Sequence, residues 1–180
     1  MKNETGFTLI ELVLVIAVVS ALVMALAFQY VGWQGGYNIE SEMKQLHTDL
    51  MSARGSAMLR NRDHFVTLAA TQYSVYDDTN PAPDGNGALE VATDRRVVQR
   101  RLNPQYPILL SDPAAVPPQI NFGQKGLSRN DIVICANPVD TSLNADNDCI
   151  ILTTTRINLG KLTTKISDGG ACDAANCVAQ

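Results

Sequence analysis

The feature that most constrains this chain is a long apolar run near its start. Residues 7–31 read FTLIELVLVIAVVSALVMALAFQYV and contain no Pro, no Gly and a single charge, Glu11. As an α-helix, about 25 residues extend roughly 37 Å, which exceeds the hydrocarbon thickness of about 30 Å. An ordinary secretory signal would end in a small-residue cleavage site after a shorter apolar core. We therefore predict that residues 7–31 form a membrane-inserted helix.

Glu11 is the unusual residue in this run. An ionised carboxylate in hydrocarbon costs on the order of 3 kcal/mol or more. No basic residue follows it within the apolar run. A simple signal anchor leaves this charge unexplained, so we expect Glu11 to need a partner, and none lies nearby in the sequence.

Residues 6–12, GFTLIEL, followed by the aliphatic run, resemble the processing signal of type IV pilins and type II secretion pseudopilins. The resemblance implies a leader peptide at residues 1–6, cleavage between Gly6 and Phe7 by a prepilin peptidase, and N-methylation of Phe7. It also implies that Glu11 pairs with the N-terminal amine of a neighbouring subunit. A carboxylate and an ammonium buried together are each less costly than alone.

One departure from the family pattern narrows the resemblance. Major type IV pilins commonly carry a helix-bending Pro late in the apolar run, whereas residues 25–30 here read ALAFQY. Without Pro the helix keeps its backbone hydrogen bonds and no kink is enforced. The departure favours a minor subunit.

The segment after the apolar run has weak helix propensity. Gly32, Gly35 and Gly36 each cost about 1 kcal/mol in a helix interior, so we expect a bend or a local break there. Trp33 and Tyr37 have two interpretations. They suit the aromatic belt of a membrane interface, or they pack against the globular part of the chain.

Residues 32–62 then show an amphipathic helical pattern that ends near Asn61. One apolar stripe recurs at spacings of three and four: Ile39, Met43, Leu46, Leu50, Ala53 and Ala57. We predict that this stripe packs on a globular head formed by residues 63–180. The head contains short β-rich runs, among them 64–70, 72–76, 88–93, 96–102, 119–122, 131–135 and 149–159, separated by turn-forming clusters.

The expected fold class is therefore α+β, with a long N-terminal helix packed on an antiparallel β-sheet head. A long helix followed by a β head is also what the pilin family implies. Within that family, DIVIC at 131–135, CIIL at 149–152 and RINLGK at 156–161 are most similar to the H-type pseudopilins (GspH) and the FimT and FimU minor pilins.

The chain has four cysteines, all in its last quarter, which suits two disulfides in an oxidising compartment. Three connectivities are open. We favour pairing between sequence neighbours, Cys135–Cys149 and Cys172–Cys177. The first would join two hairpin strands, and closing a loop of about 15 residues contributes roughly 3 kcal/mol.

Metal binding is the competing interpretation. Zinc is disfavoured because no C-x-x-C pair exists and both His47 and His64 lie far upstream. Residues 140–148, DTSLNADND, concentrate the oxygen donors that calcium prefers, but they do not match an EF-hand, and a solvated turn is favoured. We expect no metal and no cofactor.

Arginines form two clusters, one at the end of the amphipathic helix and one on a predicted strand: Arg54, Arg60 and Arg62, then Arg95, Arg96, Arg100 and Arg101. The second cluster suggests a DNA-binding minor pilin of a DNA-uptake pilus as the alternative function. The net charge of −4 and the alternation of side chains along a strand both argue against it. A solvated face or a subunit contact is favoured.

The sequence contains no convincing nucleophile–base pair, phosphate loop or paired carboxylates, so we expect no enzymatic activity. We predict a minor pilin or pseudopilin that is held in the bacterial inner membrane by a single span, with a periplasmic head. It then joins a type IV pilus or a type II secretion filament. Its expected partners are other pilin subunits, the prepilin peptidase, the inner-membrane assembly platform and membrane lipid. A membrane-anchored sensor head remains a third reading.

Overall fold

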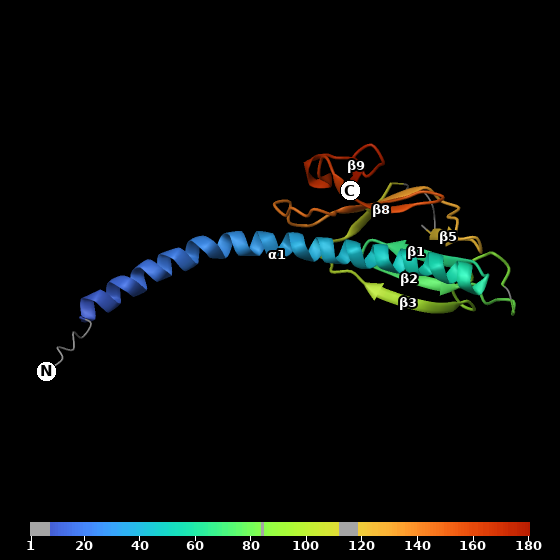
Figure 1. Ribbon diagram of the computed structural model, residues 1–180, viewed down its shortest axis with the longest axis horizontal. Coiled ribbons are helices and arrows are strands. Elements are labelled where there is room, and N and C mark those ends of the chain that lie inside the picture. Colours follow the sequence, from blue (N-terminus) through green and yellow to red (C-terminus); the bar gives the residue numbers. More distant parts are fainter. Residues whose placement is uncertain (1–7, 84, 112–118) are drawn as a thin grey trace.

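A long helix and two antiparallel sheets make up the chain in this computed structural model, which describes residues 8–83, 85–111 and 119–180. Figure 1 shows helix α1 (Leu9–Arg60) with its N-terminal half projecting away from the head and its C-terminal half lying along the sheets. The predicted α+β class is confirmed.

Helix α1 has defined ends. Thr8 is the N-cap, and its hydroxyl accepts a hydrogen bond from the Glu11 N–H at 3.3 Å. Asn61 is the C-cap in the left-handed region, a conformation that Asn tolerates, and its N–H donates to the Ala57 carbonyl.

The local break expected at the glycines is absent, because α1 continues through them as one helix that curves between its N-terminal half and the head (Figure 1). A Cβ at Gly35 would overlap the side chain of Leu143, and a Cβ at Gly36 would overlap the backbone carbonyl of Asn144. These two glycines let a loop of the head approach the helix backbone closely. Packing by this loop offsets the weak helix propensity of the segment.

The first sheet follows the helix directly in the sequence. Its strands lie in the order β3-β2-β1-β5, all antiparallel: β1 (His64–Ala69), β2 (Gln72–Asp77), β3 (Arg95–Arg101) and β5 (Gln119–Phe122). Strand β3 forms one edge of this sheet (Figure 1).

The run expected at residues 88–93 forms turns instead of a strand. The Asp94 carboxylate accepts hydrogen bonds from the N–H groups of Thr79, Asn80 and Glu90, at 2.7 to 3.3 Å. A side chain that accepts local backbone donors stabilises turns at the expense of a strand ladder.

The second sheet has the order β4-β6-β7-β8-β9. Its strands are β4 (Ile108–Leu110), β6 (Ile132–Ala136), β7 (Cys149–Leu152), β8 (Ile157–Leu162) and β9 (Cys177–Ala179), and a short 3₁₀ helix η1 (Ile166–Asp168) precedes β9. The run expected at 149–159 is therefore two strands, β7 and β8, joined by a tight turn.

The main core lies between α1 and the two sheets. Its helical side is the predicted apolar stripe, and every member is buried: Ile39, Met43, Leu46, Leu50, Ala53 and Ala57. The stripe meets buried side chains of both sheets, including Val66, Ile120, Ile134 and Ile150. The helix therefore unites the two sheets into one head, because both depend on its apolar face.

The other face of the second sheet is covered by the C-terminal tail, and here the predicted disulfide pairing is wrong. The bonds are Cys135–Cys172 and Cys149–Cys177, with Cα–Cα distances of 5.9 and 6.1 Å. Cys135 and Cys149 face each other across β6 and β7 and are both buried beneath the tail. Each sheet cysteine bonds to a tail cysteine, so the disulfides attach the tail to the sheet.

Candidate functional site

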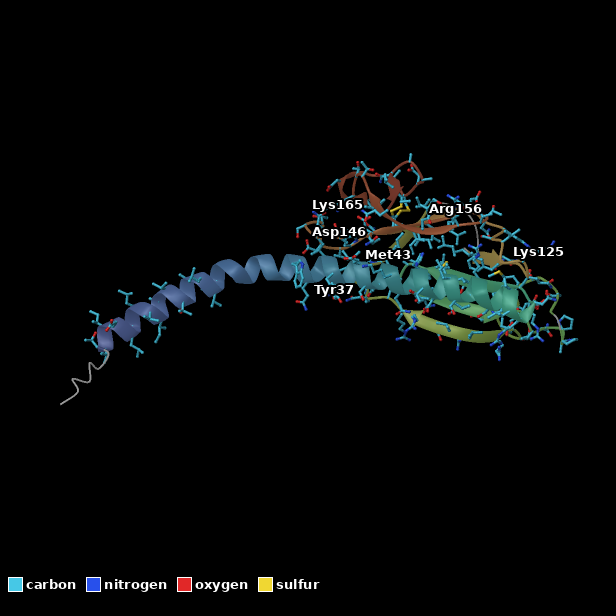
Figure 2. All side chains as sticks on the ribbon, viewed as in Figure 1. Tyr37, Met43, Lys125, Asp146, Arg156 and Lys165 are labelled. Carbon is cyan, nitrogen blue, oxygen red and sulfur yellow. A yellow bond between two sulfur atoms is a disulfide. The ribbon has the colours of Figure 1, made fainter. Side chains whose placement is uncertain are left out.

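The N-terminal half of α1 is an exposed apolar surface. From Leu9 to Met24 the large hydrophobic side chains are at least half exposed, whichever side of the helix they occupy, as in Leu9 at 82% and Met24 at 73%. In Figure 2 these side chains project from a helix that no part of the head covers. A contiguous apolar surface of this size indicates contact with a membrane or with other proteins.

We call the part of α1 that precedes Gly35, residues 9–34, the stem. Glu11 lies in its first turn, where a carboxylate interacts favourably with the helix N-terminus. It forms no ion pair with any residue that the structure describes. The predicted cleavage site, Gly6 and Phe7, and the rest of the leader lie outside the described residues. Across the described part of the chain, no helix meets the length and apolarity needed to cross a bilayer.

Trp33 and Tyr37 lie where the stem meets the head. Their rings are 71% and 62% exposed, and the ring centroids are 6.4 Å apart. Both side chains are therefore largely solvent-exposed, as an interfacial position requires.

A polar cluster fastens the middle of the helix to the first sheet. The Asp49 carboxylate accepts hydrogen bonds from the Tyr73 hydroxyl of β2 and from Nε of Arg100 on β3, both at 2.7 Å. Burial and the neighbouring carboxylate raise the pKa of Tyr73, and the bond to Asp49 raises the pKa of Arg100. The spacing of apolar residues could not reveal this cluster, because its members are far apart in the sequence.

A second polar cluster closes the distal end of the helix. The Asp77 Oδ2 atom accepts hydrogen bonds from Nη1 of Arg60 at 3.0 Å and from Nη2 of Arg95 at 2.6 Å. On its other side, Asp77 Oδ1 lies 3.8 Å from Nε2 of His64, and neither atom has a hydrogen-bond partner among the residues that the structure describes. Desolvation lowers the pKa of the buried His64.

These contacts engage two of the four strand arginines that suggested a DNA-binding patch, because Arg95 is paired with Asp77 and Arg100 with Asp49. Pairing with carboxylates within the fold weakens the attraction of these two side chains for a phosphate backbone. The DNA-binding alternative is therefore not favoured.

The loop at residues 140–148 uses its oxygen atoms for contacts within the protein. Asp148 accepts from the Leu162 N–H at 2.6 Å, Asp146 pairs with Lys161 at 3.0 Å, and Asn147 donates to Glu40 at 2.9 Å. Within the ranges that the structure describes, no three His, Cys, Asp or Glu side chains gather in a way that could hold a metal ion. The loop instead fixes the head against the helix at Gly35 and Gly36.

Sequence reasoning missed a groove of about 660 Å³ at the distal end of the head. Its polar lining includes Asp63, Asp78, Lys125 and Arg129, and Arg129 bridges to Asp63 at 3.0 Å. The Asp78 carboxylate accepts the N–H of Gly87 at 2.7 Å, which holds the turn-rich segment over the groove. The turn cluster at residues 80–87 was the one sequence signal near it.

Comparison with known proteins gives two family matches. The model described as "Type II transport protein GspH" matches residues 42–155, and the "Prokaryotic N-terminal methylation motif" matches residues 1–27. None of the curated proteins matches the chain as a relative.

Three solved structures resemble the fold. Two are of the minor pseudopilin EpsH from the type II secretion system of Vibrio cholerae. One is 11% identical with a TM-score of 0.49, covering 68% of this chain and 95% of that one. The other is 9% identical with a TM-score of 0.50, covering 69% and 96%. The type IV minor pilin FimU of Pseudomonas aeruginosa is 11% identical with a TM-score of 0.47, covering 68% and 88%. At this level of identity the likeness concerns the fold alone.

Proposed function

The chain belongs to the GspH family of type II transport proteins, and from this we propose how it enters and joins its filament. The family match and the methylation motif make it a minor pseudopilin or pilin, a structural subunit of a type II secretion or type IV pilus filament. The observation that carries the proposal is an exposed apolar stem that continues, as one helix, into the core of a folded head.

The first proposed step is maturation. A prepilin peptidase cuts between Gly6 and Phe7, and the new N-terminus of Phe7 is methylated. The methylation-motif match at residues 1–27 supports this step.

Before assembly, the stem holds the subunit in the bacterial inner membrane as a single span, with the head in the periplasm. The apolar run of residues 7–31 supports insertion. The two disulfides support an oxidising compartment for the head. An inner-membrane assembly platform then moves the subunit into the filament.

In the filament, Glu11 pairs with the N-terminal amine of a neighbouring subunit. Its carboxylate lies on the apolar stem without an ion-pair partner among the described residues, so burial between stems would leave it uncompensated. The N-terminal ammonium of a neighbouring subunit offsets the free-energy cost of burying this carboxylate. The pair also fixes the position of one stem relative to the next along the filament axis.

The test combines the mature N-terminus with assembly. We expect mass spectrometry of the native protein to find a methylated Phe7 as the first residue. The Glu11→Ala variant should be processed normally but should enter filaments several-fold less than the wild type. Ser20→Ala is the matched control, because the Ser20 hydroxyl donates only to Ile16 within the same helix, at 2.7 Å. An intact Met1, or normal assembly of Glu11→Ala, would contradict the proposal.

A further inference from the structure

Trp33 and Tyr37 form an exposed aromatic pair on helix α1. They are one helical turn apart, with ring centroids 6.4 Å apart and exposures of 71% and 62%. Trp33 is the only tryptophan in the chain. Large aromatic side chains this exposed are available to contact a surface outside the head.

Their position along the helix identifies that occupant. The head contacts α1 closely at Gly35 and Gly36, where Leu143 and Asn144 approach the helix backbone. Trp33 precedes this contact along α1. Tyr37, which directly follows the two glycines, lies at the base of the head (Figure 2).

The length of the stem agrees with this position. From Leu9 to Trp33 a helix advances roughly 36 Å, at about 1.5 Å per residue. This exceeds the hydrocarbon thickness of about 30 Å but lies within the roughly 40–45 Å that includes the headgroups. A stem that begins at one face of a bilayer therefore brings Trp33 to the headgroup region of the other face.

We propose that Trp33 and Tyr37 anchor the unassembled subunit at the outer headgroup layer of a phospholipid bilayer and set the height of the head above it. The inference rests on the proposed membrane insertion of the stem. An indole N–H and a phenol hydroxyl hydrogen-bond in the headgroup layer while their rings contact the acyl chains. Both rings must leave this layer when the subunit enters a filament.

The surrounding charges indicate that the anchor is aromatic rather than electrostatic. Lys44 is paired with Glu40 at 2.6 Å, and Lys161 is paired with Asp146 at 3.0 Å. Lys165, at the same end of the head (Figure 2), donates to the Thr141 carbonyl and lies near the Asp140 carboxylate. The positive charges at the base of the head are therefore accompanied by carboxylates. We expect the depth of Trp33 to be the same in zwitterionic vesicles and in vesicles that contain anionic lipid.

The single tryptophan allows a direct measurement. The full chain is reconstituted into phosphatidylcholine vesicles, and flotation first confirms that it co-migrates with lipid. Trp33 fluorescence is then quenched by lipids labelled near the headgroup, by lipids labelled at the acyl terminus, and by aqueous iodide. We expect the headgroup-level label to quench several-fold more than the acyl-terminal label. Iodide should quench several-fold less than it quenches free tryptophan.

Two relocated tryptophans provide the matched controls. In a Trp33→Phe background, Tyr37→Trp should report a shallower position than Trp33. Leu59→Trp, at a side chain that is 89% exposed at the distal end of α1, should be fully open to iodide and insensitive to both lipid labels.

The outcomes separate the two proposals. Failure to float with vesicles would overturn the membrane insertion of the stem. A chain that floats but leaves Trp33 open to iodide would overturn the aromatic anchor alone. Protection of Trp33 that arises only after filament assembly would also overturn the anchor and assign the rings to a contact between subunits. Stronger quenching by the acyl-terminal label would do so as well, by placing Trp33 in the hydrocarbon.

Discussion

The Cα of Gly36 lies so close beneath the backbone carbonyl of Asn144 that no side chain fits between them. With Leu143 packed over Gly35 in the same way, this contact is the point at which the head first holds the helix. On its N-terminal side the large apolar side chains from Leu9 to Met24 are exposed, and on its C-terminal side the stripe that begins at Ile39 is part of the core. The glycines therefore mark the boundary between the assembly element and the folded head.

Gly36→Ala is expected to destabilise the head by about 1–3 kcal/mol, because the added Cβ meets a backbone carbonyl that cannot rotate away. The free energy of unfolding of the full chain in mild detergent measures this. Gly55→Ala is the control in the same helix. No heavy atom lies within 4 Å of its added Cβ, so it should stabilise by about 1 kcal/mol. Equal effects of the two variants would contradict the steric role of Gly36.

Peptide mapping without reduction should recover Cys135 linked to Cys172 and Cys149 linked to Cys177. The bonds span 37 and 28 residues, and a loop of this size contributes roughly 4 kcal/mol in the chain-entropy account. Replacing both tail cysteines, Cys172→Ser with Cys177→Ser, should therefore detach the tail and expose apolar residues beneath it. Binding of a hydrophobic dye would report that exposure, and peptides that link Cys135 to Cys149 in the native protein would contradict the assignment.

Asp49 should matter more to stability than its arginine partner. Asp49→Ala leaves the hydroxyl of the buried Tyr73 without its acceptor, which costs about 1–3 kcal/mol. Arg100→Ala removes a half-exposed ion pair but keeps the Tyr73–Asp49 bond, so it should cost about 1 kcal/mol or less. Denaturant unfolding of the two variants side by side measures the difference. A larger loss for Arg100→Ala would mean that the ion pair holds the helix to the sheet.

His64 should make the head less stable in mild acid. Burial lowers its pKa, so the unfolded chain takes up a proton more readily than the folded one as the pH falls below the ordinary value near 6.5. The contribution of neutral His64 to the free energy of unfolding is therefore complete above that pH. It is lost as the pH falls through the lowered pKa of the folded state. The neighbouring Asp77 carboxylate limits the loss, while Arg60 and Arg95 on the same carboxylate add to it.

The control for this pH effect is His64→Gln, which cannot take up the proton. Thermal melts between about pH 7 and 5 should show a smaller drop for the variant than for the wild type. Parallel curves for the two proteins would show that His64 does not contribute to the acid sensitivity.

The helical half of the core could be predicted because its information is local. Residues three and four apart share a helix face, so the positions from Ile39 to Ala57 identified the buried side before any contact was known. The strands were predictable where β-branched residues are consecutive, as in the run at 131–135 that forms β6. The strand predicted at 88–93 is absent because the Asp94 carboxylate accepts hydrogen bonds from nearby backbone N–H groups and stabilises turns there.

Residue spacing could not identify the disulfide partners. Cys135 and Cys149 are sequence neighbours on adjacent strands, but both face the tail, and the tail brings its own two cysteines. Which cysteine a strand cysteine meets depends on which distant segment covers its face of the sheet, and here that segment is the C-terminal tail.

The sequence by itself therefore determined the features that are contiguous along the chain. These are the N-terminal methylation motif, the apolar stem with its single carboxylate, and the amphipathic stripe. Only the tertiary structure decided that Gly35 and Gly36 receive a loop instead of breaking the helix, and that Asp49 and Asp77 neutralise Arg100 and Arg95. The physical reason is that motifs and helix periodicity act between neighbours, whereas close packing and charge pairing join residues that folding brings together.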